Sequence, residues 1–307
     1  MNDAPIGILL AAYNAEATLD VALESLLSQT KGSWVATLVD DGSQDSTSNV
    51  MQHYAQRDAR FIVVRQNNQG TARARNAAEK LLPATVQQLA YLDADDYLEQ
   101  EYVEVISEAW RQFAPLDLLF TNAFRVDYDG GKRPWVEGRA TGALSFEHLL
   151  RRSEFLGGGA LFSRERFRAV GGFSDSYVED YDLWLRMMAT GARAYYIDRA
   201  LYCYNVAREG RKTTDRERNA QETISALDRI LKTACLNQAE QEALQDHKQG
   251  CLLRPALDAQ RDRVRLWLEH RVGATKTAKV MRAMHTLARP FRPLRKLWAQ
   301  SRKGSHV

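Results

Sequence analysis

Short apolar runs and amphipathic segments alternate along the first part of the chain. The run Ile6–Ala12 predicts a strand, and apolar residues then recur at helical spacing, at Leu19, Ala22, Leu23, Leu26 and Leu27. Further apolar runs predict strands at 34–39, 61–64 and 89–92, and a helix is expected from about 71 to 82. Strands that alternate with helices are typical of a mostly parallel sheet flanked by helices, so we expect an α/β fold.

Carboxylates follow two of these predicted strands directly. Asp40-Asp41 comes after 34–39, and Asp93-Ala94-Asp95-Asp96 comes after 89–92. Ligands gather at the carboxyl edge of open α/β sheets. Alternation places Asp93 and Asp95 on one side of the strand end, where like charges require a cation or strong donors. Oxygen ligands favour Mg²⁺ or Mn²⁺ shared with a phosphate over zinc. The alternative is an acidic turn that caps the next helix, expected from near Glu99.

Five motifs in a fixed order resemble those of the family-2 glycosyltransferases. They are Tyr13-Asn14, Asp40-Asp41-Gly42-Ser43, Gly70 with Ala74-Arg75-Asn76, Asp93-Ala94-Asp95-Asp96, and Gly171-Gly172-Phe173 with Glu179-Asp180. The resemblance extends from about Ile6 to Tyr204. It implies a GT-A fold, a nucleotide-sugar donor, a divalent metal (Mn²⁺ or Mg²⁺) and glycosyl transfer with inversion at the anomeric carbon.

The resemblance also assigns a donor site. It comprises Ala11, Tyr13, Asn14, Asp41, Gly70, Arg75, Asp93 and Ala94, with Asp95 as the metal ligand. Tyr13 would stack on the base, and Asp41 would accept the N3–H of uracil or thymine. Arg75 would pair with a phosphate or with the acidic cluster. The structural alternatives are a core position for Tyr13, a loop-shaping turn for Asp40 and Asp41, and a helix cap for Asp96.

The second half is expected to hold the acceptor and the base. The resemblance makes Asp180 the general base, which takes the proton of the acceptor hydroxyl during attack on C1. Glu179 is expected to hydrogen-bond locally, Trp184 to form a wall of the acceptor site and Asp182 to be a surface charge. Gly158, before a predicted strand at 161–163, would let a sugar or backbone approach closely, or would belong to a flexible connector.

One motif departs from the family. Many relatives carry Tyr-Arg-x-His where this chain has Tyr204-Asn205-Val206-Ala207. A histidine that would help to hold the metal or diphosphate therefore has no counterpart. The cationic residues Arg208, Arg211 and Lys212 would replace it as a lid over the pyrophosphate, or are solvated loop charges. The segment also lacks the Gln-x-x-Arg-Trp signature of processive synthases, so we expect one sugar per encounter.

Composition is that of an ordinary globular protein. The chain has 307 residues, of which 45% are hydrophobic and 26% charged. No apolar run approaches the roughly 20 residues that span a bilayer, and the N-terminus lacks a signal pattern, so we expect a cytoplasmic protein. The three cysteines, Cys203, Cys235 and Cys251, form no Cys-x-x-Cys pair and are expected to be reduced thiols, without a disulfide or zinc.

The character of the chain changes after residue 214. We expect a catalytic domain over 1–214, with donor and metal binding in 1–97 and the acceptor side in 98–214, followed by a helical, basic region over 215–307. Helices are predicted at 215–234, 238–254 and 255–271. Basic residues alternate with apolar and aromatic ones over 271–303, which favours contact with an anionic membrane surface. The alternatives are packing on the catalytic domain and a nucleic-acid-binding arm, and no nucleic-acid motif accompanies the segment.

The sequence therefore predicts a metal-assisted, non-processive glycosyltransferase. Its donor would be a nucleotide sugar, with UDP favoured, and its acceptor a glycan or lipid-linked molecule at the cytosolic face of a membrane, in surface polysaccharide assembly by family analogy. Two other functions stay open. One is another metal-dependent nucleotide enzyme, such as a nucleotidyltransferase, although no Gly-rich triphosphate loop follows the first strand. The other is a catalytically weak, membrane-associated scaffold that still binds nucleotide.

Overall fold

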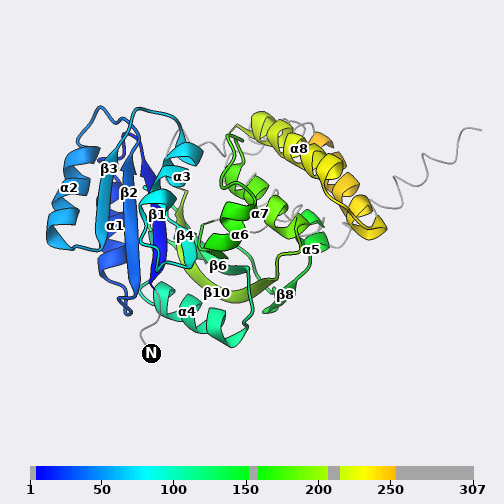
Figure 1. The fold of residues 1–307 in the computed structure, drawn as a ribbon, viewed down its shortest axis with the longest axis horizontal. Coiled ribbons are helices and arrows are strands. Elements are labelled where there is room, and N and C mark those ends of the chain that lie inside the picture. Colours follow the sequence, from blue (N-terminus) through cyan, green and yellow to red (C-terminus); the bar gives the residue numbers. More distant parts are fainter. Residues whose placement is uncertain (1–4, 152–157, 207–214, 254–307) are drawn as a thin grey trace, which may run out of the picture. The chain divides into compact units, whose positions relative to one another are not determined.

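The computed structural model describes residues 5–151, 158–206 and 215–253. Ten strands of this part form one sheet, in the order β3-β2-β1-β4-β9-β6-β10-β5, with β7 paired to β6 and β8 to β10 (Figure 1). The strands are β1 Ile6–Ala12, β2 Trp34–Asp40, β3 Phe61–Arg65, β4 Gln88–Tyr91, β5 Tyr97–Leu98, β6 Leu118–Val126, β7 Lys132–Pro134, β8 Gly142–Leu144, β9 Leu161–Ser163 and β10 Ala194–Asn205.

The first half of the sheet is parallel, as the alternation of strands and helices predicts. β1 pairs in parallel with β2 and β4, and β2 pairs in parallel with β3. β9 is antiparallel to both β4 and β6, so it reverses direction between two parallel groups. β6 and β10 are parallel to each other. The carboxyl ends of β1, β2, β4, β6 and β10 therefore lie at one edge of the sheet.

Helices cover both faces of the sheet. They are α1 Leu19–Leu27, α2 Thr47–Arg57, α3 Thr71–Leu81, α4 Tyr102–Gln112, α5 Phe146–Arg151, α6 Arg164–Ala169, α7 Glu179–Ala189 and α8 Arg216–Thr233, and residues 238–253 are also helical. The predicted strands and helices of the first half are confirmed, as are β9 and the two helices after residue 214. The helix expected near Glu99 begins at Tyr102, after the unpredicted strand β5.

Two hydrophobic clusters lie on opposite faces of the sheet. In β4, Leu89 and Tyr91 belong to the cluster under α3, α5, α6, α7 and α8, whereas Ala90, and Leu92 directly after the strand, belong to the cluster under α1, α2 and α4. This strict alternation follows from the pleat of a strand that is buried on both faces. The face that carries Tyr91 is therefore the one on which α3 and α7 approach each other, and the candidate site forms there.

The helices after residue 214 contribute to the first cluster. Ala226, Leu227 and Ile230 of α8 and Ala243 and Leu244 of the following helix are buried in it. The chain divides into two units after Cys251, so these helices belong to the same unit as the sheet. The predicted helix at 255–271 and the basic segment 271–303 lie outside the described residues. No helix in the described part of the chain is both long and apolar enough to cross a membrane.

Candidate functional site

The loops after β1 and β2 are joined by hydrogen bonds. The Asn14 backbone N–H donates to Ser43 Oγ at 3.0 Å, and its side-chain Oδ1 accepts from the Gln44 N–H at 2.8 Å. Asn14 has φ near 50°, a left-handed conformation that asparagine tolerates better than most residues. Tyr13, beside it, is 47% exposed. The turn thus presents an accessible aromatic ring at the carboxyl edge of the sheet, and the alternative of a core position for Tyr13 is wrong.

Asp41 is the centre of a second loop network. It is buried, and its Oδ1 accepts from the Gln69 N–H at 2.9 Å and the Gln66 side chain at 2.8 Å. Its Oδ2 accepts from the Gly70 N–H at 2.8 Å. Asp41 therefore shapes the loop that leads into α3. A carboxylate has about four acceptor positions, and these three donors occupy three of them.

Asp40, next to it, shapes the turn after β2. Its side chain is fully buried, and Oδ1 accepts from the Ser43 N–H at 2.8 Å. Its Oδ2 is 3.4 Å from a guanidinium nitrogen of Arg65 at the end of β3. These contacts are the loop-shaping role that the sequence left open for Asp40.

Arg75 of α3 connects the acidic motif after β4 to the start of α7. Its guanidinium pairs with Asp93 and, at 3.2 Å, with Glu179 Oε1. The same group lies 3.9 Å above the centre of the Tyr91 ring. Burial lowers the pKa of Arg75, but the charges of Asp93 and Glu179 raise it and prevail, so the group stays cationic. Arg75 is buried, and in the structure it pairs with the acidic cluster, one of the two partners expected for it.

The Gly-Gly-Phe motif is held against α3 by Asn76. The Asn76 amide donates to the Phe173 carbonyl at 2.8 Å, and its Oδ1 accepts from the Phe173 N–H at 2.9 Å. A Cβ on Gly172 would come within 2.6 Å of Asn76 Oδ1, and Gly172 has φ of 74°. Glycine is therefore required there both by the close approach and by the backbone conformation. The two motifs, about a hundred residues apart, form one structural unit.

Asp180 lies in the first turn of α7 and is half-buried. Its Oδ2 accepts a hydrogen bond from the Tyr91 hydroxyl at 3.1 Å, and its Oδ1 accepts from the Tyr181 N–H at 2.7 Å. Because Tyr91 lies two residues before Asp93, the proposed base is placed beside the donor-side acidic motif. The structure thus brings Asp93, Arg75, Glu179 and Asp180 together.

The acidic motif has one internal and two more accessible carboxylates. Asp96 is buried, and it accepts from the Tyr202 hydroxyl at 2.8 Å and from the Asn205 N–H at 2.9 Å. Burial raises the pKa of Asp96 well above its usual value, and the charges of Asp93 and Asp95 raise it further. This is the electrostatic strain that an added cation would relieve.

The donor set fits a divalent metal that is shared with a phosphate. Asp95 and Asp93 are partly exposed, and Asp93 is already paired with Arg75. Among the described residues, no group of three or more His, Cys, Asp or Glu side chains is placed to hold a metal. Mg²⁺ and similar cations are commonly bound by one or two carboxylates together with substrate phosphates. Asp95 therefore fits as a protein ligand, with the remaining ligands from a bound diphosphate.

Three expectations for the acceptor side are wrong. Trp184 is 1% exposed and packs edge-on against Phe120 and Phe162 in the core, so it forms no wall of an open site. Asp182 is buried rather than a surface charge. A Cβ on Gly158 would lie 2.4 Å from Tyr202 Cζ. The missing side chain of Gly158 makes room for the Tyr202 ring, not for a sugar.

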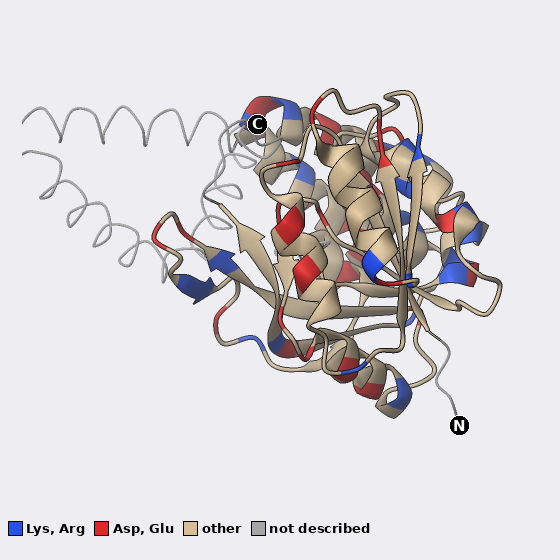
Figure 2. Cartoon of the chain, turned by 90° about the vertical axis from the view of Figure 1, so that its left-hand side faces the viewer, with Lys and Arg blue, Asp and Glu red and all other residues tan. Residues whose placement is uncertain are grey.

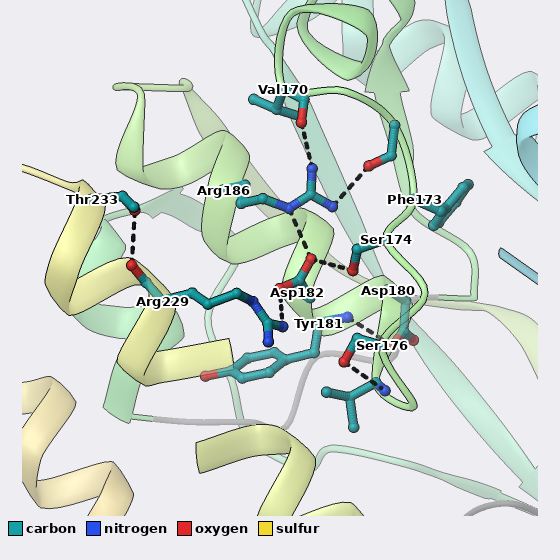
Figure 3. Close-up of polar contacts among 12 residues, drawn as sticks. Val170, Phe173, Ser174, Ser176, Asp180, Tyr181, Asp182, Arg186, Arg229 and Thr233 are labelled. Carbon is teal, nitrogen blue, oxygen red and sulfur yellow. Dashed lines mark hydrogen bonds and ion pairs between the residues drawn. The ribbon is translucent and has the colours of Figure 1, made fainter. Parts of the chain in front are cut away.

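Asp182 organises the segment around the base (Figure 3). Its Oδ2 accepts from Ser174 Oγ at 2.6 Å and from Arg186 Nε at 2.8 Å, and its Oδ1 accepts from Arg229 of α8 at 2.7 Å. Arg186 also donates to the carbonyls of Val170 and Gly172. Burial raises the pKa of Asp182, but the hydrogen bonds from Ser174 and Arg229 and the charge of Arg186 lower it below its usual value. The Gly-Gly-Phe loop, α7 and α8 are thus joined through one carboxylate.

The remaining predicted residues are placed as follows. Ala94 is buried in the core, Ala11 is partly buried at the end of β1, and Gly70 begins α3 with φ of 90°. The cationic residues Arg208, Arg211 and Lys212 lie outside the described residues. In the view of Figure 2, acidic and basic positions are interspersed over the described elements.

Several site residues carry no motif in the sequence. Tyr91 and Tyr202 lie in strands among apolar residues. Their hydroxyls nevertheless donate hydrogen bonds to carboxylates of the site, Tyr91 to Asp180 and Tyr202 to Asp96. Trp135, after β7, packs edge-on against Tyr204 with ring centres 5.3 Å apart, and Arg125 lies over its ring. The only signal available for Tyr91 was a polar atom in a predicted apolar strand, because a buried hydroxyl requires a partner. No strand was predicted around Tyr202, so the sequence carries no signal for it.

Comparison with known proteins agrees with this geometry. The family model described as Glycosyl transferase family 2 matches residues 8–171, more than half of the chain. A chondroitin synthase of Escherichia coli is 25% identical over 225 residues, which cover 70% of this chain and 31% of that protein. The chain spans about a third of the length of the first curated relatives that it matches.

Two solved structures show the same fold. S. aureus TarS 1–349, in complex with UDP-GlcNAc, has a TM-score of 0.67 at 18% identity, over 81% of this chain and 73% of that chain. The mannosyltransferase PcManGT from Pyrobaculum calidifontis, in complex with GDP-Man and Mn²⁺, has a TM-score of 0.62 at 17% identity, over 95% of this chain and 82% of that chain. The expected GT-A fold is confirmed.

Proposed function

This chain belongs to glycosyl transferase family 2, and we propose that it transfers a sugar from a nucleotide-sugar donor to an acceptor hydroxyl with inversion at the anomeric carbon. One observation carries the proposal. Arg75 pairs with Asp93 of the donor-side motif and with Glu179, the neighbour of Asp180, so a donor site and a base lie on one face at the carboxyl edge of the sheet. A nucleotidyltransferase would have no use for a base at this position.

The donor that we propose is a UDP-sugar. Tyr13 is exposed where a base would stack, and Asp41 keeps acceptor capacity beyond its three loop hydrogen bonds. A base with an N3–H donor, as in uracil, would donate to the remaining acceptor position of the Asp41 carboxylate, whereas cytosine has no such donor. The TarS structure with UDP-GlcNAc supports this choice.

The chemistry follows from the placement of Asp180. Its carboxylate takes the proton of the acceptor hydroxyl while that oxygen forms a bond to C1. The bond between C1 and the diphosphate oxygen breaks, and UDP leaves with the electron pair. A divalent metal held by Asp95 and the diphosphate would neutralise the charge of the leaving group. PcManGT, whose structure contains Mn²⁺, supports a metal of this kind. Arg75 pairs with both Asp93 and Glu179 and so fixes the position of the donor-side motif relative to the start of α7.

The acceptor that we propose is a glycan or a lipid-linked sugar. Trp135 and Tyr204 replace Trp184 as candidates for the aromatic wall, because both are partly exposed and Tyr204 directly precedes Asn205, whose N–H binds Asp96. The likeness to a chondroitin synthase supports a role in polysaccharide assembly. A cytosolic membrane face is the proposed setting, on the basic and apolar pattern of residues 271–303.

Calorimetric binding of UDP, dTDP, GDP and CDP, with Mn²⁺ and with chelator, tests the donor site. We expect Mn²⁺-dependent binding of UDP or dTDP that Asp95→Ala abolishes, while Asp129→Ala, an exposed acidic residue in a turn, binds as the wild type does. Asp180→Asn should bind UDP normally but lose turnover of UDP-sugars. Nucleotide binding with no effect of Asp180→Asn on any turnover would favour the scaffold, and no nucleotide binding at all would refute the transferase.

A further inference from the structure

We propose that Tyr91 is the positioning residue for the general base. Its hydroxyl donates a hydrogen bond to Asp180 and fixes the orientation of that carboxylate. The inference rests on the proposed function, because it takes Asp180 as the base. It assigns a role in proton transfer to a strand residue that the family motifs do not single out.

The position of Tyr91 follows from the strand. β4 buries alternate residues on opposite faces, and Tyr91 shares its face with Asp93, two residues on. On this face the first turn of α7 lies above the strand end, and the Tyr91 Oη is 3.1 Å from Asp180 Oδ2. A phenylalanine would fill the same space in the core, so packing accounts for the ring but not for the hydroxyl.

The Tyr91 ring is fixed on two sides. The Arg75 guanidinium lies 3.9 Å from the ring centre, and the Phe173 ring meets it at 82° with centres 5.9 Å apart. Tyr91 is 2% exposed. A hydroxyl on a ring held in this way has little freedom, so its hydrogen bond fixes the orientation of the carboxylate rather than following it.

The hydroxyl can act only as a donor to Asp180. Burial raises the pKa of Tyr91 well above its usual value, and the charge of Asp180 raises it further. The phenol therefore stays protonated over the working pH range. The other carboxylate oxygen accepts from the Tyr181 N–H at 2.7 Å. Two fixed donors hold the carboxylate in one orientation, and its remaining lone pairs can receive the acceptor proton.

The other charges near Asp180 are known and stay in place when the hydroxyl is removed. Arg75 faces Asp180 from α3, and the charges of Asp93, after the end of β4, and of Glu179, which precedes Asp180 on α7, act on Tyr91. Arg75 neutralises part of the charge of the two carboxylates through its pairs with both. Tyr91→Phe leaves these charges and the stacked ring unchanged, so any change in turnover reports the hydrogen bond itself.

The experiment compares kcat and KM of Tyr91→Phe and the wild type in the release of UDP from UDP-GlcNAc and UDP-Glc with Mn²⁺. A base that has lost its fixed orientation takes the proton less efficiently, so kcat should fall by about tenfold, which is a part of what a positioned general base contributes. KM and calorimetric UDP affinity should not change, because the donor contacts are untouched. An unchanged kcat, or a rise in KM that accounts for the whole loss, would overturn the proposal.

Tyr102→Phe is the matched control. Tyr102 is a fully buried tyrosine of α4 whose hydroxyl has no hydrogen-bond partner in the part of the chain that the structure describes. Removing that hydroxyl deletes the same atom from the opposite face of the sheet, and kcat should stay that of the wild type. Equal losses of kcat in both variants would mean that the effect is not specific to Asp180.

A second measurement keeps this inference separate from the proposed function. If the wild type turns over no UDP-sugar, the proposed function fails, but the hydrogen bond can still be measured. ¹³C NMR of aspartate carboxyls at one neutral pH, with the Asp180 resonance assigned through Asp180→Asn, reports the surroundings of that carboxylate directly. A changed Asp180 chemical shift in Tyr91→Phe, with the other aspartate resonances in place, supports the proposal, and an unchanged shift refutes it.

Discussion

Removal of the Asp182 carboxylate should destabilise the protein strongly. In Asp182→Ala, Arg186 and Arg229 lose their shared acceptor, and the Ser174 hydroxyl loses its partner. Deleting one partner of a buried ion pair costs about 3–5 kcal/mol. The side chains of Arg186 and Arg229 are 23% and 49% exposed, so water partly replaces what they lose. We therefore expect the lower end of that range, about 3 kcal/mol.

Thermal unfolding followed by circular dichroism measures this effect. A loss of about 3 kcal/mol should lower Tm by about 6–12 °C in a domain of this size. The control is Asp175→Ala, in the loop that precedes α7. This substitution removes the exposed partner of Arg73. Because both of those side chains are more than half exposed, Tm should not change measurably. Similar Tm values for the two variants would refute the view that burial makes the Asp182 network strong.

Three further predictions concern pH, a glycine and the donor loop. The pKa of Asp182 is lower in the folded protein than in the unfolded chain. The Asp182 carboxylate therefore stabilises the fold above about pH 4, and this stability is lost as the pH falls through the folded pKa. Acid unfolding followed by circular dichroism should show a smaller loss of stability in Asp182→Asn. Gly158→Ala should cost about 1–3 kcal/mol in thermal unfolding by displacing Tyr202, and should weaken Mn²⁺-dependent UDP binding. Asp41→Ala should lower calorimetric UDP affinity by about tenfold or more, because the loop before α3 loses its acceptor.

The first half of the fold could be predicted because its strands are apolar on both faces and its helices follow in order. The limits of β1 were predicted to the residue, and those of β2, β3 and β4 to within one residue. The second half could not be predicted in this way. β5 has two residues, and β10 has irregular register against β6. Such strands are specified by their neighbours in the sheet more than by their own pattern.

The acceptor-side residues show why burial could not be predicted there. Acidic residues in the first turn of a helix usually compensate its dipole at the surface, so Asp182 resembled an ordinary surface charge. Its burial depends on Arg229 of α8, 47 residues further along the chain. Trp184 lies on the same helix, and its orientation toward Phe120 and Phe162 depends on how α7 packs on the sheet. Neither the partner of Asp182 nor those of Trp184 can be identified from the sequence of α7 alone.

The same reasoning explains why the carboxylates and the pairing of Arg75 with the acidic motif could be predicted from the sequence, whereas the contacts of Arg75 with Glu179 and of Tyr91 with Asp180 could not. Asp41, Asp93 and Asp95 follow strands, so parallel topology alone brings them to one edge. Arg75 and Glu179 are 104 residues apart, and Tyr91 and Asp180 are 89 apart. Those contacts exist only if α3, β4 and α7 meet on one face. Arg75 stacks on the ring of Tyr91 while it pairs with Asp93 and Glu179. With Asp180 as the proposed base, a shift of α7 would disturb the donor-side carboxylate and that base together, so we expect donor binding and proton transfer to be coupled through the Arg75 side chain and the Tyr91 ring.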